Sequence, residues 1–176
     1  MTFAQRLIGA ALLDSRVYEE VEADRHATGQ ALAVVLVASV AGGIGLRGLG
    51  APNPQAFVAG VVGALVGWIA WAALTYLIGT RLLPEPQTRA DIGELLRTIA
   101  FASSPGLLRA FGVIPLLGGP IYAIATVWML VAMVVAIRQA LDYTTTVRAL
   151  GVCVTGWVLS LVIAAIIGIL FAPSVS

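Results

Sequence analysis

The chain has 176 residues, of which 60% are apolar and 11% are charged, and its mean hydropathy is strongly positive. Soluble domains of this length do not bury such a fraction of apolar residues, so the composition excludes an ordinary soluble protein and indicates an integral membrane protein. The net charge of +1 excludes general attraction to nucleic acid, and the lone Cys153 excludes an intrachain disulfide.

Residues 1–26 predict a cytoplasmic or interfacial arm. Apolar residues recur there at helical spacing among charges, namely at Leu7, Ile8, Ala11, Leu12, Val17, Tyr18 and Val21. This pattern is typical of an amphipathic helix that lies in the membrane interface. The same stretch lacks the short apolar core of a signal peptide, so we expect the first apolar run to be retained.

Long runs without charge predict membrane-spanning helices in a domain that covers residues 27–172. Four of these runs are long enough to cross about 30 Å of hydrocarbon. Prolines and glycines set their limits, because they interrupt a helix. The predicted spans are 27–46, 55–79, 120–137 and 149–172.

A fifth span is predicted over residues 95–117, and its middle is unusual. Ser103, Ser104 and Pro105 should interrupt the helix, with the hydroxyl groups bonding the backbone that the proline frees. Arg109 follows at membrane depth, where a charge usually faces the bundle interior, a cavity or a partner. These four residues form the candidate intramembrane functional group. The alternative for Arg109 is that it snorkels to a lipid phosphate.

The distribution of arginine favours five crossings over a re-entrant third segment. Cytoplasmic loops carry an excess of basic residues. Five crossings with a cytoplasmic N-terminus place eight arginines inside and one, Arg47, outside, whereas a re-entrant segment gives six against three. The predicted fold is therefore an all-α bundle of five transmembrane helices plus the interfacial helix, with the C-terminus outside. All nine acidic residues also fall on the inner side.

Four acidic residues and a tyrosine near the first span form a candidate docking site for a partner. The group consists of Tyr18, Glu19, Glu20, Glu22 and Asp24. Such acids can bind a basic partner or a divalent cation, or they can form a plain solvated helix face. We expect Glu19, Glu20 and Glu22 to remain free for a partner.

A second polar cluster is predicted on the inner face. Its members are Asp91, Glu94, Arg97, Arg138, Asp142 and Arg148. Helical spacing places the first three on one face, so the two inner loops can present complementary charge. We expect Glu94 or Asp91 to approach Arg138 or Arg148.

Motifs of catalysis and of cofactor binding are not found. A zinc protease needs paired histidines, but the chain has only His26, and none of its serines lies in a Gly-x-Ser-x-Gly motif. The glycines of residues 42–50 lack the lysine of a phosphate loop, so close helix packing or a flexible loop explains them better. Gly63 and Gly67 permit close approach of another helix. We expect no enzyme activity, no metal and no cofactor.

Several segments occur in an order that resembles the bacterial branch of the Yip domain family. They are residues 17–24, 76–80, 93–97 continuing to 104–106, and 138–142 with 144–149. The resemblance covers about residues 14–170. It implies five spans and a cytoplasmic N-terminus. Eukaryotic relatives interact with Rab GTPases, act in vesicle traffic and membrane shaping, and carry an Asp-Leu-Tyr-Gly-Pro type motif that this chain lacks.

The expected function is a non-enzymatic scaffold or adaptor in the bacterial cytoplasmic membrane, which docks a partner or organises lipid through its cytoplasmic polar face. The alternative is a conduit for a small solute, ion or lipid, or a transporter subunit, built on the broken third span and Arg109. The expected partners are membrane lipids and a protein partner or a second copy of the chain, but not nucleic acid.

Overall fold

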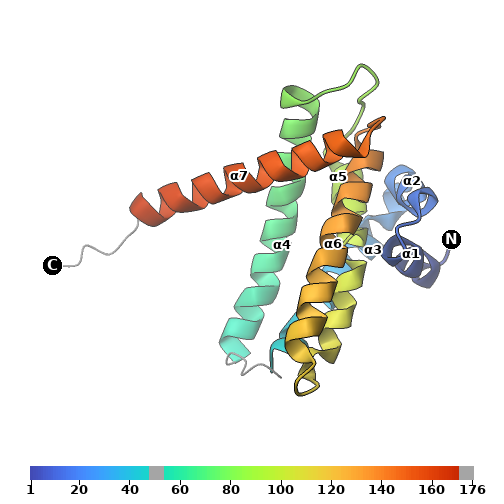
Figure 1. Ribbon diagram of the computed structural model, residues 1–176. Helices are drawn as coiled ribbons and strands as arrows, with labels where there is room; N and C mark the ends of the chain where they lie inside the picture. Colours follow the sequence, from blue (N-terminus) through green and yellow to red (C-terminus); the bar gives the residue numbers. More distant parts are fainter. Residues whose placement is uncertain (48–53, 171–176) are drawn as a thin grey trace.

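The computed structural model describes residues 1–47 and 54–170, and every regular element in these stretches is helical (Figure 1). The predicted all-α class is therefore confirmed for the described part of the chain. In chain order the elements are α1 (Phe3–Ala11), α2 (Ser15–Ala23), η1 (Arg25–Ala27), α3 (Thr28–Arg47), α4 (Pro54–Leu77), η2 (Ile78–Leu82), α5 (Ile92–Phe101), η3 (Ser104–Val113), α6 (Gly118–Ala140) and α7 (Thr146–Leu170).

Four stretches of the described residues are long and apolar enough to cross a membrane. They are Arg25–Leu46, Pro54–Leu82, Gly118–Ala140 and Thr146–Ile163. They overlap the four predicted spans 27–46, 55–79, 120–137 and 149–172, because in lipid an apolar segment has to satisfy its backbone hydrogen bonds within a helix. Residues 171–172 of the last predicted span lie outside the described residues.

The predicted span over residues 95–117 does not form one continuous helix. The α-helix α5 ends at Phe101, and η3, a 3-10 helix, begins at Ser104. Pro105 has no backbone N–H to donate, so the α-helical pattern of hydrogen bonds cannot continue through it. The Ser104 hydroxyl donates to the Phe101 carbonyl oxygen at 2.6 Å. The predicted interruption and the bonding of Ser104 to the backbone are both confirmed.

The N-terminal arm contains two short helices where the sequence predicted one. The chain reverses at Leu13, which adopts a left-handed φ of 63°, and the Asp14 side chain then caps α2. The Tyr18 hydroxyl donates to the Ala10 carbonyl oxygen at 2.9 Å and joins the two helices. Gly9 allows their close approach, because an added Cβ would lie 2.5 Å from Cγ2 of Val17.

This arm packs on the side of the bundle (Figure 1). The rings of Phe3 and Phe101 meet edge to face with centroids 6.4 Å apart, and the Trp128 indole donates to the Ala11 carbonyl oxygen at 2.7 Å. Val17, Tyr18 and Val21 join one hydrophobic core with residues of α3, α5 and α6. The arm is therefore part of the folded bundle.

Helix α3 and η3 approach each other closely at Gly45. A Cβ added there would lie 1.9 Å from the Arg109 carbonyl oxygen. This position confirms that close packing explains a glycine of residues 42–50, of which residues 48–50 lie outside the described residues. Gly63 and Gly67, in contrast, have no neighbouring atom within 4 Å of an added Cβ, so no helix of the described chain uses their spacing.

Helix α7 differs from the other long helices in direction. In Figure 1 it crosses α4 obliquely and extends beyond the bundle. Its first half is packed, with Val152 and Cys153 buried in a second core, whereas Leu161, Val162 and Ile163 further along are exposed. This second half leaves apolar surface available for lipid or for another chain.

Candidate functional site: the polar end of the bundle

Most charged side chains gather at one end of the bundle, called here the polar end. It is formed by α2, residues 83–91, the start of α5 and the turn at residues 141–145 (Figure 1). A hydrogen bond of 2.8 Å from the Gln139 amide to the Glu19 carboxylate links α6 to α2 there. The polar end therefore combines both clusters that the sequence predicted.

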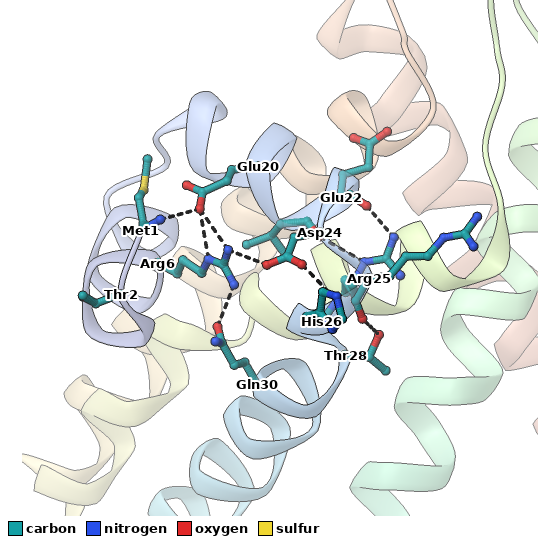
Figure 2. Close-up of polar contacts among 12 residues, drawn as sticks. Met1, Thr2, Arg6, Glu20, Glu22, Asp24, Arg25, His26, Thr28 and Gln30 are labelled. Atoms are coloured by element: carbon teal, nitrogen blue, oxygen red, sulfur yellow. Dashed lines mark hydrogen bonds and ion pairs between the residues drawn. The ribbon is translucent and has the colours of Figure 1, made fainter.

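Arg6 organises the acids that face α1. Its guanidinium donates to Glu20 at 2.9 Å, to Asp24 at 2.6 Å and to the Gln30 side chain at 2.9 Å (Figure 2). The Met1 amino group also donates to Glu20, at 2.7 Å. These bonds lower the pKa of Glu20, with the amino group as the largest cause, and Arg6 is the largest cause of the lowered pKa of Asp24.

The expectation that Glu19 and Glu20 remain free is therefore wrong, because Glu19 accepts from Gln139 and Glu20 accepts from Arg6 and the Met1 amino group. The sequence pattern does not indicate the role of Arg6, because its pairing with residues 14 and 18 positions away requires the reversal at Leu13. A leucine does not indicate a left-handed turn in a sequence, because residues with such side chains rarely adopt a positive φ. Tyr18 is also corrected as a docking residue, since its side chain is fully buried and belongs to the core.

Arg97 ties α5 to the end of α2. Its side chain, in a residue only 5% exposed, donates to the Val21 carbonyl oxygen at 3.0 Å and to that of Glu22. Carbonyls in the last turn of a helix lack intrahelical partners, and a positive charge there is favourable. Arg97 therefore fixes the position of Glu22. Asp91 and Glu94 cap the start of α5 through reciprocal bonds to each other's backbone N–H.

The turn at residues 141–145 is held by Glu85, which the sequence pattern does not single out. Its carboxylate accepts from the Thr144 backbone N–H at 3.1 Å and pairs with Arg148 Nε at 3.0 Å. The Thr144 N–H is the largest cause of the lowered pKa of Glu85.

The expected approach of Glu94 or Asp91 to Arg138 or Arg148 is thus wrong for Arg148. Arg138 instead donates to the carbonyl oxygens of Tyr143 and Thr144 and to the Thr146 hydroxyl, and no ion pair joins it to an acid among the described residues. Arg138 therefore binds nearby carbonyl oxygens and Arg148 binds Glu85, and the spacing of charges along the sequence indicates neither pairing.

An acidic hollow of about 340 Å³ remains at the centre of the polar end. We define it by its lining residues, which are Glu19, Glu22, Ala23, Glu94, Arg138, Gln139, Asp142 and Tyr143. It brings four carboxylates together with one guanidinium. Burial, and then the charges of Glu94, Asp142 and Glu19, raise the pKa of Glu22 to about 7.

The divalent-cation alternative finds no support in this geometry. Within residues 1–47 and 54–170, no three His, Cys, Asp or Glu side chains are arranged to hold a metal ion. The hollow has more negative than positive groups, and Ala23 and Gln139 add apolar and amide surface beside them. Such a surface suits a cationic group of a partner.

The intramembrane candidates lie outside the hollow, at the start of η3 and along it. Arg109 Nη2 donates to the Thr126 hydroxyl at 2.9 Å, and its guanidinium lies 5.5 Å from the centre of the Tyr122 ring. Arg109 Nε is buried, and Arg109 lines a cavity with Ser103. Pro105 and Ser104 are buried in the break itself.

The fold and the apolar helices define an all-helical integral membrane protein. The family model described as the Yip1 domain matches residues 12–173 of the sequence, from the arm to the end of the last apolar run. The chain belongs to the Yip1 domain family. No curated protein and no solved structure gives a match.

Proposed function

We propose that this Yip1-domain protein is a non-enzymatic membrane scaffold that docks a basic protein segment in the acidic hollow. The observation that carries the proposal is the gathering of Glu19, Glu22, Glu94 and Asp142 around one cavity. A bundle in lipid folds through apolar length and close packing, which do not require these acids. The raised pKa of Glu22 means that its negative charge is disfavoured in the folded chain, so the charged carboxylate lowers the stability of the fold. Recognition of a partner is a reason for such a residue that stability does not supply.

We place the hollow in the cytoplasm of a bacterial cell, with five crossings and the C-terminus outside. The arginine split supports this orientation. The lengths of α5 and η3 support the extra crossing, since ten α-helical and ten 3-10 residues together span about 35 Å. Arg97 contacts α2 at the polar end, and the Arg109 carbonyl lies beside Gly45 near the other end of α3.

The experiment is a titration of the purified full chain in detergent with a fluorescent peptide rich in Lys and Arg. The test variant combines Glu19→Gln, Glu22→Gln and Asp142→Asn. Asparagine tolerates the left-handed φ of 53° at position 142. Loss of charge-assisted hydrogen bonds should weaken binding about tenfold or more at low salt.

The matched control is Asp14→Asn, which removes a carboxylate outside the hollow and keeps the ability to cap α2. It should bind the peptide as the parent chain does. If the triple variant also binds like the parent, the docking proposal is wrong and the acids form only a solvated face. If the partner is a second copy of the chain, the parent chain should form a dimer and the triple variant should not.

A conduit remains the second candidate function, favoured by the cavity beside Arg109. A conduit has to move its solute from one side of the membrane to the other. Anion flux into sealed liposomes that contain the protein, compared with empty liposomes, distinguishes it from a scaffold, which should add no flux.

A further inference from the structure

A cavity of about 320 Å³ lies between α3, α4, η3 and α6, away from the acidic hollow. Its walls are mostly apolar, and no carboxylate lines it. Small residues such as Ala64 and Gly67 stand beside larger ones such as Trp68 and Met129. Its size is at the lower end of the range of about 300–1,000 Å³ that is typical of ligand pockets. It can therefore receive an apolar chain or a small molecule.

Two buried hydrogen-bond donors in this cavity have no partner. Across residues 1–47 and 54–170, the buried side-chain nitrogen or oxygen atoms without a hydrogen bond are Trp71 Nε1 and Arg109 Nε. Both residues line the cavity. Buried donors are almost always paired, because leaving one unpaired costs free energy. The unpaired Nε of Arg109 indicates that an acceptor is missing beside this side chain.

Arg109 also lacks a counter-ion among the described residues. All nine acids of the chain lie within the described residues, and none of them pairs with Arg109. Its neutral contacts, the Thr126 hydroxyl and the Tyr122 ring, do not neutralise the charge. An anionic group is the missing partner, and a guanidinium matches the geometry of a phosphate.

We propose that this cavity binds an anionic phospholipid, with its phosphate at Arg109 and one acyl chain along α4. A lipid fits better than a free anion, because the walls are apolar and α4 is a spanning helix of which little is buried. Gly60 and Gly67 leave space for the chain, since no atom lies within 4 Å of an added Cβ at either position. Arg109 lies near the end of α3 opposite the polar end, at a level that headgroups can reach.

The structure also supplies matched variants for the test. Gly67→Leu fills the cavity, whereas Gly63→Leu adds the same side chain to another surface of α4, beside Val62 and Val66. Arg109→Gln removes the charge, and Arg81→Gln removes an exposed arginine outside the cavity. The measurement is native mass spectrometry of the delipidated full chain in detergent, titrated with phosphatidylglycerol and, in a second arm, with inorganic phosphate.

We expect Gly67→Leu and Arg109→Gln to weaken phosphatidylglycerol binding about tenfold or more, and both controls to bind like the parent. Inorganic phosphate in excess should not displace the lipid. Unchanged lipid binding by Gly67→Leu would overturn the proposal even if Arg109→Gln fails to fold. Displacement by inorganic phosphate would also overturn it and leave a simple anion site. The proposal does not depend on docking at the acidic hollow.

Discussion

Single arginine side chains decide how the arm is attached. Arg6 joins α1 to the acids of α2, and Arg97 joins α5 to the last carbonyls of α2. Both residues are almost fully buried, so their charges are held by fixed partners and not by water. Glu22 is the opposite case, because its surroundings disfavour its charge.

Glu22→Gln should change the pH dependence of stability. Burial among other acids raises the pKa of Glu22 from 4.5 in the unfolded chain to about 7 in the folded one. The folded state therefore binds this proton more tightly, and the stability it contributes is full below pH 4.5 and is lost as the pH rises through about 7. Glutamine resembles the protonated acid, so the variant should show a flatter profile of Tm against pH in this window.

Thermal unfolding in detergent across that window provides the measurement, with Asp14→Asn as the control. The control should keep the slope of the parent, because Asp14 lies outside the hollow. A Glu22→Gln profile that matches the parent would show that Glu22 titrates normally in the folded chain.

At the scale of elements, the contact between α3 and η3 depends on the absence of a side chain at Gly45. Gly45→Ala should destabilise the protein by about 1–3 kcal/mol, because the new methyl group would overlap the Arg109 carbonyl and push the two elements apart. Gly60→Ala serves as the comparison. It enters open space in α4 and should be neutral or stabilise by about 0.5–1 kcal/mol.

Tm values of the two variants in detergent provide the test. Equal Tm values for Gly45→Ala and Gly60→Ala would mean that α3 and η3 can separate at no cost. In that case the close approach would not hold the broken segment in place.

The sequence predicts elements well where lipid leaves few choices. Uncharged runs gave α3, α4, α6 and α7, since only a helix satisfies their backbone in hydrocarbon, and Pro105 marked the break before η3. The arm was predicted less well, because the left-handed turn at Leu13 has no signal in its residue type. The partners of Arg148 and Arg97 were missed for another reason, since they depend on loop paths and on tertiary contacts.

For the whole molecule, docking of a cytoplasmic partner requires that the polar end of the bundle faces the cytoplasm. The polar end holds the acidic hollow, and the cavity beside Arg109 opens nearer the other end of α3. Scaffold and lipid site then lie toward opposite sides of one membrane. This arrangement requires α5 and η3 to cross it together, despite the break between them.

Topology reporters fused after Thr88, after Leu117 and after Thr144 test this arrangement most directly. The first and third positions flank α5, η3 and α6, and the second lies between η3 and α6. With five crossings, the reporters after Thr88 and Thr144 should both be cytoplasmic and the one after Leu117 should be outside. Reporters after Thr88 and Thr144 on opposite sides would show a re-entrant segment and contradict the account.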